Sequence, residues 1–434
     1  MKFILALFSL LSVISGESAS ENHFESEYEV ITIAESEEKQ IWFGYYDKWQ
    51  VDTTGRYALG CKVELFFRSP TREDVLKIGL IDLEADNSWT KIGESRAWSW
   101  QQGCMLQWIP GSSEEVIWND VNDDGAFVSR VYNIRTQSLR TLPKAVYTLS
   151  PNGEFGLCLD FDRLQFYRPG YGYPAEEKPE FRVKAPTDKG IYRMDLKTGE
   201  CELILSISDI AGIHRPQGSV SEYYHWFNHL LINESGNRFF FLNRSRPWAA
   251  ESEMMSYLES VESPHDRFRG YWVTRAITAN LDGNDVYVLN DSGRFSHFIW
   301  KADKVITAWG AAENNEHPGF FEFLDKTKYS LLLDPQNMPD NGHNTYVPNT
   351  NYEWILNDTY PDANDRKQTL YLYHVPSKRK VVLGRFYQPE IFTGEWRCDL
   401  HPRCDQQGSR VFFDSTHEGH RKMYMIDISK IISS

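Results

Sequence analysis

The sequence lacks an excess of positive charge. Its 434 residues carry 46 Lys and Arg against 61 Asp and Glu, a formal net charge of −15. Nucleic-acid binding depends on neutralising phosphates with clustered cations, so this balance argues against a nucleic-acid partner. It does not exclude an anionic sugar, because a metal ion or a few local arginines can reverse the field inside one cleft.

The chain also lacks a membrane-spanning segment. Near its start, an apolar run from Phe3 to Ile14 is followed by small residues. A run of this length is too short to cross a bilayer and is typical of a cleaved secretory signal. No later segment approaches membrane length, and no Cys follows the run to carry a lipid. We expect a signal peptide over residues 1–20 and a periplasmic or secreted protein without a membrane anchor.

The cysteines show neither CxxC nor zinc-site spacing. Cys61 and Cys158 lie inside expected strands, where single buried thiols are common, so we expect one disulfide at most. The six cysteines are Cys61, Cys104, Cys158, Cys201, Cys398 and Cys404.

What the chain does contain is an internal repeat. It is clearest in HLLINESGNRFFFLN (229–243) and HPRCDQQGSRVFFDS (401–415), where an anchor residue precedes a short apolar stretch, a polar turn with Gly and a β-rich strand. Each copy is followed by a second β-rich run, which is the pattern of a propeller blade. The seven anchors are Lys48, Met105, Val146, His229, His297, His343 and His401.

The repeat predicts an all-β fold, a seven-bladed β-propeller that occupies residues 21–434 as one domain. We expect the strand in 28–34 to join the last blade beside 422–428, because such pairing closes the ring and removes exposed edges. Two long intervals between anchors imply insertions near 164–190 and 248–271. The Pro- and Gly-rich stretch 169–181 predicts a loop, whereas apolar residues at helical spacing predict a short helix in 249–268.

Four successive anchors are histidines: His229, His297, His343 and His401. Equivalent positions in a radial repeat point toward one axis, so we expect these imidazoles to gather on one half of a propeller face. Histidine is the commonest metal ligand and the commonest general base. Neutral imidazoles favour Mn²⁺ or Zn²⁺ over Ca²⁺. Asp399, two residues before His401, is a further oxygen ligand or orients a histidine.

Other polar residues precede the same anchors, and together they suggest a cleft suited to an acidic sugar. Arg244, at the end of the strand that follows His229, is expected to face that histidine. Taken one at a time, each of these residues equally fits a satisfied polar group at a blade end. The further candidates are Tyr46, Lys48, Gln102, Tyr224, His225, Arg397 and Arg403. Aromatic residues, 14% of the chain, stack on sugars but more often fill cores.

The repeat, with His before a polar Gly turn and the closing segment 401–427, resembles the secreted β-propeller polysaccharide lyases. The likeness is chiefly to the oligogalacturonate lyases, more loosely to the ulvan lyases, and in the repeat itself to TolB-like propellers. It covers most of the chain at blade level, with the tightest similarity in blades four and seven. The family pattern Gln-x-x-His-x-His corresponds here to Arg397-x-Asp399-x-His401-x-Arg403, so the Gln and one His are absent.

The resemblance implies β-elimination from a uronic-acid sugar in an oligo- or polysaccharide, assisted by a divalent metal. Mn²⁺ is favoured, with Zn²⁺ or Ca²⁺ as alternatives. It assigns metal ligation to His297, His343 and His401 together with Asp399. If the metal were lost, Arg397 and Arg403 would neutralise the carboxylate.

The same resemblance assigns the catalytic roles. The base is His225 or His229, assisted by Arg244, and the acid is Tyr46 or Tyr224. Lys48, Gln102, Tyr224, Arg397 and Arg403 bind substrate.

Two other functions compete. A glycoside hydrolase needs two positioned carboxylates, for which Asp47 and Asp399 are the candidates at blade starts. A non-enzymatic propeller that binds a glycan or a protein needs no titrating cluster and leaves the four histidines unexplained.

Overall fold

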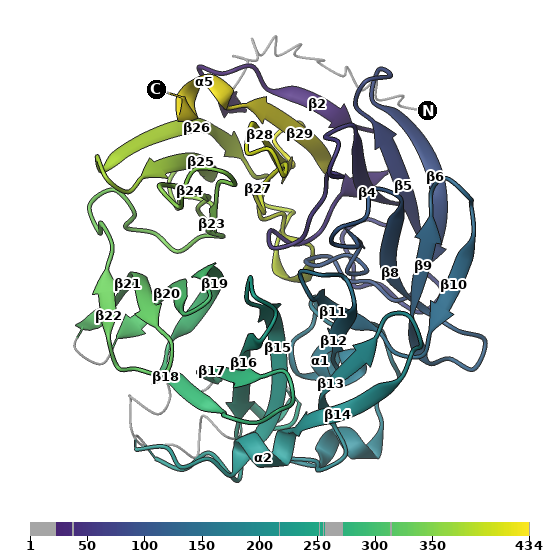
Figure 1. Cartoon of the computed structure of the whole chain (residues 1–434), viewed down its shortest axis with the longest axis vertical. Coiled ribbons are helices and arrows are strands. Elements are labelled where there is room, and N and C mark those ends of the chain that lie inside the picture. Colours follow the sequence, from purple (N-terminus) through teal and green to yellow (C-terminus); the bar gives the residue numbers. More distant parts are fainter. Residues whose placement is uncertain are drawn as a thin grey trace, which may run out of the picture.

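The computed structural model describes residues 23–36, 39–216, 218–250, 252–254, 256, 272–312 and 315–433. Within these ranges the strands form seven separate antiparallel sheets around a central axis (Figure 1). The seven-bladed propeller predicted from the repeat is therefore confirmed. The expected signal peptide, residues 1–20, lies outside the described residues.

The first three blades each contain four strands. Blade one consists of β3 (Gln40–Trp42), β4 (Tyr57–Val63), β5 (Leu76–Asp82) and β6 (Ser88–Ser95). Blade two consists of β7 (Gln107–Trp108), β8 (Glu115–Val121), β9 (Phe127–Asn133) and β10 (Leu139–Leu142). Blade three consists of β11 (Val146–Leu149), β12 (Phe155–Cys158), β13 (Gly190–Asp195) and β14 (Cys201–Ser206).

Blades four and five also contain four strands each, running outward from the axis. Blade four consists of β15 (Tyr224–Ile232), β16 (Arg238–Arg246), β17 (Val273–Asn280) and β18 (Tyr287–Gly293). Blade five consists of β19 (Phe295–Ala302), β20 (Val305–Ala312), β21 (Asn315–Leu324) and β22 (Ser330–Leu332).

The last two blades incorporate strands from the N-terminal part of the chain. Blade six consists of β23 (Thr345–Tyr346), β24 (Trp354–Asn357), β25 (Lys367–His374) and β26 (Arg379–Tyr387), with β1 (Phe24–Glu25) at its outer edge. Blade seven consists of β27 (Arg403–Cys404), β28 (Arg410–Ser415) and β29 (Lys422–Asp427), with β2 (Ile31–Ala34) outside β29.

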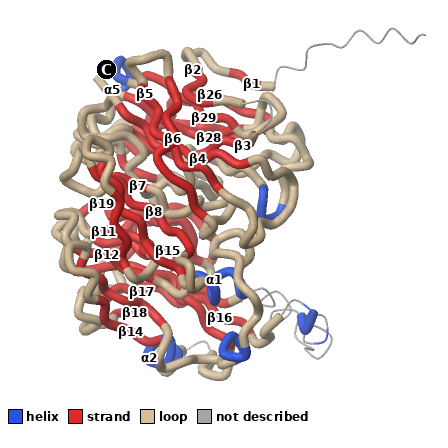
Figure 2. Tube along the Cα trace, turned by 90° about the vertical axis from the view of Figure 1, so that its right-hand side faces the viewer, coloured by secondary structure: helices blue, strands red, loops and turns tan. Residues whose placement is uncertain are grey.

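Short helices lie between or beyond the strands, mainly at the edges of the strand layers (Figure 2). They are α1 (Phe161–Tyr167), the 3-10 turn η1 (Pro179–Arg182), α2 (Ile207–Ala211), the 3-10 turn η2 (Gly394–Trp396) and α5 (Ser429–Ile432). The loop expected at 169–181 thus ends in a 3-10 turn. Of the helix expected in 249–268, residues 252–254 and 256 are helical, and the other residues from 257 onward lie outside the described part.

The core consists of apolar residues from alternating strand positions, packed between neighbouring blades. The largest buried side chains include Trp42, Trp98, Trp100 and Trp118, which fill the space between blades one and two. The six cysteines are free thiols. None of the helices in the described ranges is long and apolar enough to cross a membrane.

Ring closure follows the expected pairing of the N-terminal strand with the last blade. Ile31 pairs with Met425 and Thr32 with Tyr424, so β2 completes blade seven as its outermost strand. Ile33 is 1% exposed, whereas Ile31 on the same strand is only half-buried. The pairing of β1 with β26 was not expected from the sequence.

We expect Ile33→Ala to destabilise the fold by about 2–4 kcal/mol, because it removes buried methyl groups from the closing strand. Ile31→Ala is the matched control, since it makes the same chemical change at a half-buried position of β2. Urea denaturation followed by tryptophan fluorescence measures both free energies of unfolding. Equal losses in the two variants would contradict a role of Ile33 in holding the ring closed.

Candidate functional site

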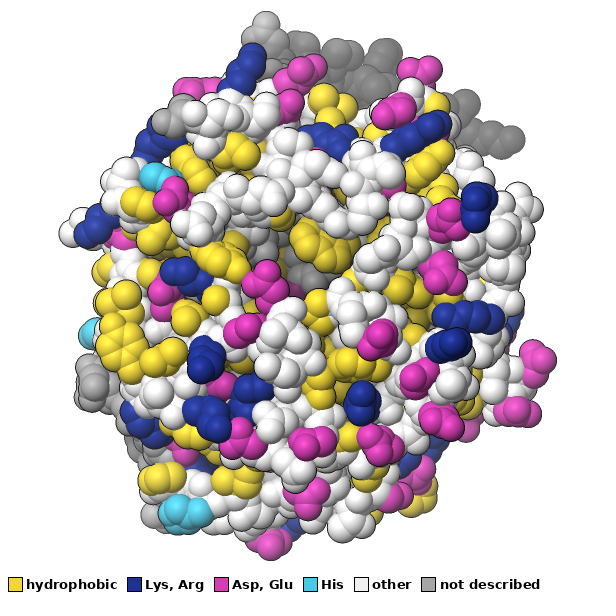
Figure 3. Space-filling model, viewed as in Figure 1, with side chains coloured by type: hydrophobic (Ala, Val, Ile, Leu, Met, Phe, Trp, Pro, Cys, Tyr) yellow, Lys and Arg dark blue, Asp and Glu magenta, His cyan; other side chains and the backbone are white. Residues whose placement is uncertain are grey.

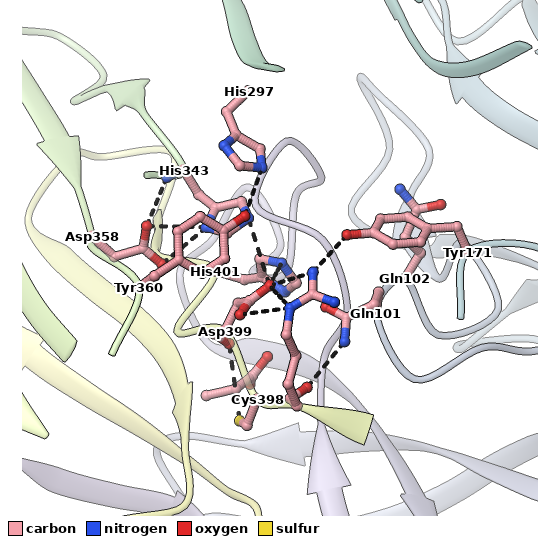
Figure 4. Close-up of polar contacts among 12 residues, drawn as sticks. Gln101, Gln102, Tyr171, His297, His343, Asp358, Tyr360, Cys398, Asp399 and His401 are labelled. Atoms are coloured by element: carbon pink, nitrogen blue, oxygen red, sulfur yellow. Dashed lines mark hydrogen bonds and ion pairs between the residues drawn. The ribbon is translucent and has the colours of Figure 1, made fainter. Parts of the chain in front are cut away.

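The four anchor histidines meet at the centre of the ring. The ring centroid of His343 lies 4.1 Å from that of His297 and 4.4 Å from that of His401. Tyr45 joins His229 to the group, with its ring centroid 5.1 Å from His229 and 5.0 Å from His401. All four histidines are buried. Figure 4 shows His297, His343 and His401 with their polar neighbours.

An unusual backbone conformation turns the anchors inward. His229, His297 and His401 have φ values of 52°, 32° and 43°, and Met105 at the equivalent position of blade two has 55°. The strand register shifts at His229 and at His297. Left-handed φ is uncommon for residues other than Gly and costs free energy, so it persists only where the surrounding structure enforces it. In blades two, four, five and seven the anchor residue therefore adopts a left-handed backbone conformation, and in blades four and five it lies at a break in the strand register.

Three of the gathered residues can hold a metal ion. One donor atom from each of His343, Asp399 and His401 lies within 4.8 Å of the other two. Oδ2 of Asp399 is 4.0 Å from Nε2 of His343 and 3.9 Å from Nε2 of His401, too far for a hydrogen bond. Both Nε2 atoms are buried without a hydrogen-bond partner. Buried polar atoms are rarely left unpaired, so a cation that takes all three donors fits this arrangement.

Asp358 fixes the orientation of His343. Its carboxylate oxygens lie 3.0 Å and 3.1 Å from Nδ1 of His343, and Oδ1 also accepts the His343 backbone N–H at 2.6 Å. With Nδ1–H donating to Asp358, the lone pair of Nε2 faces Asp399. Gly342 permits this contact, because a Cβ there would lie 1.9 Å from the Asp358 carbonyl oxygen. A carboxylate behind a histidine is the usual outer support of a metal ligand.

His297 lies beside this group with both ring nitrogens engaged. Nδ1 is 2.9 Å from Oδ1 of Asn341, and Nε2 is 3.4 Å from the hydroxyl of Tyr360. Burial, and then the nearby His343, lowers the pKa of His297 well below its usual value. The sequence predicted His297 as a ligand, and the structure places it against His343 but outside the set His343, Asp399 and His401.

His229 lies on the other side of Tyr45 and is held by Asp47. Its Nε2 is 3.2 Å from Oδ2 of Asp47, whose Oδ1 accepts from Nζ of Lys48 at 2.9 Å. Burial lowers the pKa of His229, although the adjacent Asp47 opposes this shift. For Asp47 itself, burial raises the pKa, but Lys48 and then His229 outweigh it and bring the value to about 2. His229 is thus a neutral imidazole oriented by a carboxylate.

Cationic side chains border the histidines. Arg244 is 6% exposed, and its Nε and Nη1 atoms have no hydrogen-bond partner. Burial, and then the charge of Arg168, lowers its pKa to about 9. Arg397 donates to Asp399 at 3.0 Å and to the hydroxyl of Tyr171 at 2.7 Å. Burying a guanidinium with unpaired N–H groups costs free energy unless an anion accepts hydrogen bonds from these groups.

Tyr171 is a second titratable group in this region. Burial alone would raise its pKa, but Arg397 and Arg168 outweigh that effect and lower the value to about 8. The guanidinium of Arg168 lies over the rings of Tyr171 and Trp272, 4.3 Å and 4.5 Å from their centroids. A phenol with this environment can exchange a proton near neutral pH.

Two predicted site residues are held by contacts with neighbouring segments of the chain. The ring of His225 is fully buried, with Nε2 2.7 Å from the Val220 carbonyl oxygen and Nδ1 against Asn243. Arg403 pairs with Asp414 at 2.9 Å and donates to the carbonyl of His401 at 2.7 Å. These contacts fix the positions of both side chains and help to hold the inner strands together.

Four other candidates lie close to the cluster or on its rim. The hydroxyl of Tyr46 donates to the Phe298 carbonyl at 2.9 Å, so Tyr46 is not free to act as an acid. Nε2 of Gln102 donates to Tyr147 at 2.7 Å, which leaves Oε1 buried without a partner. Tyr224, the first residue of β15, stacks on Tyr167. Lys48 is buried and engaged by Asp47.

Sequence reasoning missed several residues of the site. Asp358 had a usable signal, because it follows His343 by fifteen residues, the same interval that separates Arg244 from His229. Tyr45 directly precedes Tyr46, which was a predicted site residue. Arg168, Tyr171 and Trp272 lie in or beside the inserted segments, where the repeat gives no guidance.

Comparison with known proteins gives a match of fold. No family model and no curated protein matches the sequence. A solved oligogalacturonate lyase in complex with manganese aligns over 94% of this chain and 95% of its own, with a TM-score of 0.62 and 13% identity. An oligogalacturonate lyase from Vibrio parahaemolyticus aligns over 93% and 96%, with a TM-score of 0.61 and 14% identity. The resemblance stated from the sequence is thus found again at the level of the fold.

TolB from Acinetobacter baumannii also aligns, over 86% of this chain and 81% of its own. The TM-score is 0.38 at 11% identity.

We expect His343→Ala, Asp399→Ala and His401→Ala each to weaken the binding of Mn²⁺ or Zn²⁺ by roughly 100-fold or more, because each removes one ligand. Asp358→Asn is expected to cost roughly 10–100-fold through loss of ligand orientation. Isothermal titration calorimetry measures the affinities, and His374→Ala on the outer part of blade six is the control. Unchanged affinity in His343→Ala would refute the shared metal site.

A second prediction concerns the stability of the folded chain. Burial lowers the pKa of His225 to about 4, whereas an exposed histidine titrates near 6.5. Between these pH values the unfolded chain takes up a proton that the folded chain does not, so stability falls as pH drops from about 6.5 to about 4. The loss amounts to at most about 3 kcal/mol. His225→Gln should flatten this dependence in urea denaturation, and parallel curves would contradict it.

Proposed function

We propose that this protein is a lyase that cleaves an acidic, uronate-containing oligo- or polysaccharide by β-elimination. The observation that carries the proposal is the buried, unpaired guanidinium of Arg244 beside an imidazole–carboxylate cluster. Such a site suits a ligand that brings its own negative charge. The likeness of fold to the oligogalacturonate lyases supports the same class of reaction.

The uronate carboxylate is bound by the cations. Arg244 offers Nε–H and Nη1–H groups that no described residue accepts, and Arg168 adds positive charge nearby. A guanidinium matches a carboxylate in a two-point contact. Neutralising the C6 carboxylate stabilises the negative charge that develops when the C5 proton leaves, which lowers the barrier.

His229 is the proposed base. Its Nε2–H is directed at Asp47, so the lone pair lies on Nδ1, and no described residue forms a hydrogen bond to that atom. The carboxylate of Asp47 stabilises the imidazolium that forms when Nδ1 accepts the C5 proton. Asp47 thereby acts as a positioning residue.

Tyr171 is the proposed acid. Its hydroxyl lies 2.7 Å from Nη2 of Arg397, and that contact stabilises the phenolate left after proton transfer. In the complete step the C5–H and C4–O4 bonds break, a C4=C5 double bond forms, and O4 leaves with the proton from Tyr171. His229 then releases the C5 proton to solvent and Tyr171 regains a proton from solvent, so no water is consumed.

His343, Asp399 and His401 would hold the divalent ion, with His297 beside them. Two nitrogen donors and one carboxylate oxygen suit Mn²⁺ or Zn²⁺ better than Ca²⁺. When bound, the ion supplies a Lewis acid that draws electron density from the uronate carboxylate. Asp358 keeps His343 in the tautomer required for this role.

The proposal is tested by incubating the full chain with Mn²⁺ and a panel of uronate polymers and following near-ultraviolet absorbance. The expected product is an unsaturated uronate, which absorbs there. We expect Arg244→Ala to lower kcat/KM by about 100-fold or more, because it removes the charge that stabilises the transition state. His229→Ala should lower kcat by a similar factor.

The control variant is Arg135→Ala, since that guanidinium is exposed on blade two and contacts only Glu114 and solvent. New reducing ends without ultraviolet absorbance would instead indicate a glycoside hydrolase. Saccharide binding without any product would indicate a non-enzymatic propeller.

A further inference from the structure

A second cavity lies at the other end of the inner strands. His297, His343 and His401 lie at or just before the starts of their inner strands and His229 lies within β15, whereas a cavity of about 570 Å³ is lined by the strand ends and by the turns that follow. Viewed down the ring axis, the molecule has a hollow at the centre of the face in view, with hydrophobic side chains on its wall (Figure 3). We call this cavity the turn-side chamber. Its volume is typical of a site for one small ligand.

Aromatic side chains form much of the chamber wall. Nε1 of Trp300 donates to the Leu231 carbonyl at 3.0 Å and the hydroxyl of Tyr346 contacts Thr307 at 2.8 Å, so the polar atoms of these two side chains are satisfied within the protein. Trp49 is 38% exposed. The ring surfaces of Trp49 and of the partly exposed Tyr352 therefore remain for contact with a ligand, whereas Trp300 and Tyr346 are buried in the wall. The aromatic lining residues are Tyr46, Trp49, Trp300, Tyr346 and Tyr352.

The charged groups of the chamber are paired, in contrast to Arg244. Lys48 is paired with Asp47, Lys301 with Glu322, and Arg403 with Asp414. Glu234 is the remaining charged lining residue, and it accepts a hydrogen bond from the Tyr352 hydroxyl at 2.8 Å. The chamber thus presents no free cation among its described lining residues. An anionic sugar would lose hydration there without gaining a counter-charge.

The chamber mouth is shaped by a strained turn. Asn349, Asn351 and Tyr352, between β23 and β24, have φ values of 61°, 50° and 60°. Asn349 donates to the carbonyl of Gln406 on blade seven, and Tyr352 reaches Glu234 on blade four. The turn of blade six is therefore tied to two other blades. The exposed amide of Asn351 forms no hydrogen bond among the described residues and faces solvent at the mouth.

We propose that the turn-side chamber binds a short neutral saccharide. Sugar rings present C–H faces to aromatic walls, and their hydroxyl groups can donate to the Glu234 carboxylate and exchange hydrogen bonds with the Asn351 amide. Pairing of the other charges excludes a uronate. This site is separate from the proposed lyase site and does not depend on it, although both share the layer formed by Tyr46, Asp47 and Lys48.

The test is isothermal titration calorimetry of the full chain with cellobiose, maltose, mannobiose and xylobiose, and with digalacturonate as the acidic probe. At least one neutral disaccharide should bind. Trp49→Ala should weaken that binding by roughly tenfold or more through loss of an aromatic wall. Tyr329→Ala removes an exposed aromatic residue on β22, outside the chamber, and is the matched control.

Arg244→Ala separates the two proposals. It should leave neutral-disaccharide binding unchanged and abolish that of digalacturonate, whereas Trp49→Ala should weaken neutral-disaccharide binding by roughly tenfold or more and leave that of digalacturonate unchanged. The chamber proposal is overturned if none of the four neutral disaccharides binds. It is also overturned if Trp49→Ala leaves their affinity unchanged or if Arg244→Ala abolishes their binding. Neutral-saccharide binding in a protein without lyase activity would instead refute only the proposed reaction.

Discussion

The geometry of the central cluster depends on the hydrogen bonds that join blade seven to blade one. Ile41 N–H donates to the carbonyl of Arg421, and Phe43 N–H to the carboxylate of Asp414, so the segment after β3 is fixed to blade seven. That segment then crosses the axis, where Asp47 contacts His229 of blade four. Closure by β2 therefore does more than protect an edge. Ring closure fixes the distance between residues near the start of the chain, such as Asp47, and residues of the last blade.

Burial controls the chemistry of the cluster. Removal from water lowers the pKa values of His229, His297 and His401, so these imidazoles stay neutral and keep lone pairs available. For His343 burial acts in the same direction, but Asp358 and the other nearby carboxylates outweigh it and raise the pKa. The same loss of water makes the unpaired guanidinium of Arg244 costly. One end of the axis therefore attracts negative charge, while the charges at the other end are already neutralised.

Much of the architecture could be predicted from the sequence, because the repeated pattern of strands and turns defines the blades. The strand and turn spacing gave the number of blades, and the position of β2 followed from the need to close a ring. The convergence of the four histidines followed from their equivalent positions. These inferences need only periodicity, which a single sequence displays.

The details of the site could not be predicted in the same way. His225 and His229 lie on one strand, but a register shift between Asn228 and Leu231 separates their surroundings. The sequence predicted that Arg403 lines a cleft, yet its guanidinium forms an ion pair with Asp414 on the neighbouring strand. Arg168 and Trp272 lie outside the repeat pattern, so only three-dimensional packing brings them to the cluster. Bulges, partner choice and insertions are properties of the folded chain.

The site thus combines residues of the blade repeat with residues of an inserted segment, and the two kinds of segment differ in how well they tolerate substitution. The imidazoles and Asp399 stand at or beside repeat positions, where a substitution also disturbs the ring. Arg168 and Tyr171 follow α1 in the segment between β12 and β13, outside the blade sheets. Exchange of that segment would change the surroundings of Arg244, whose pKa the charge of Arg168 lowers, while the anchor positions of the blades stay in place. The blade repeat thus keeps the four histidines together, while a segment outside the repeat supplies charged and aromatic neighbours to them.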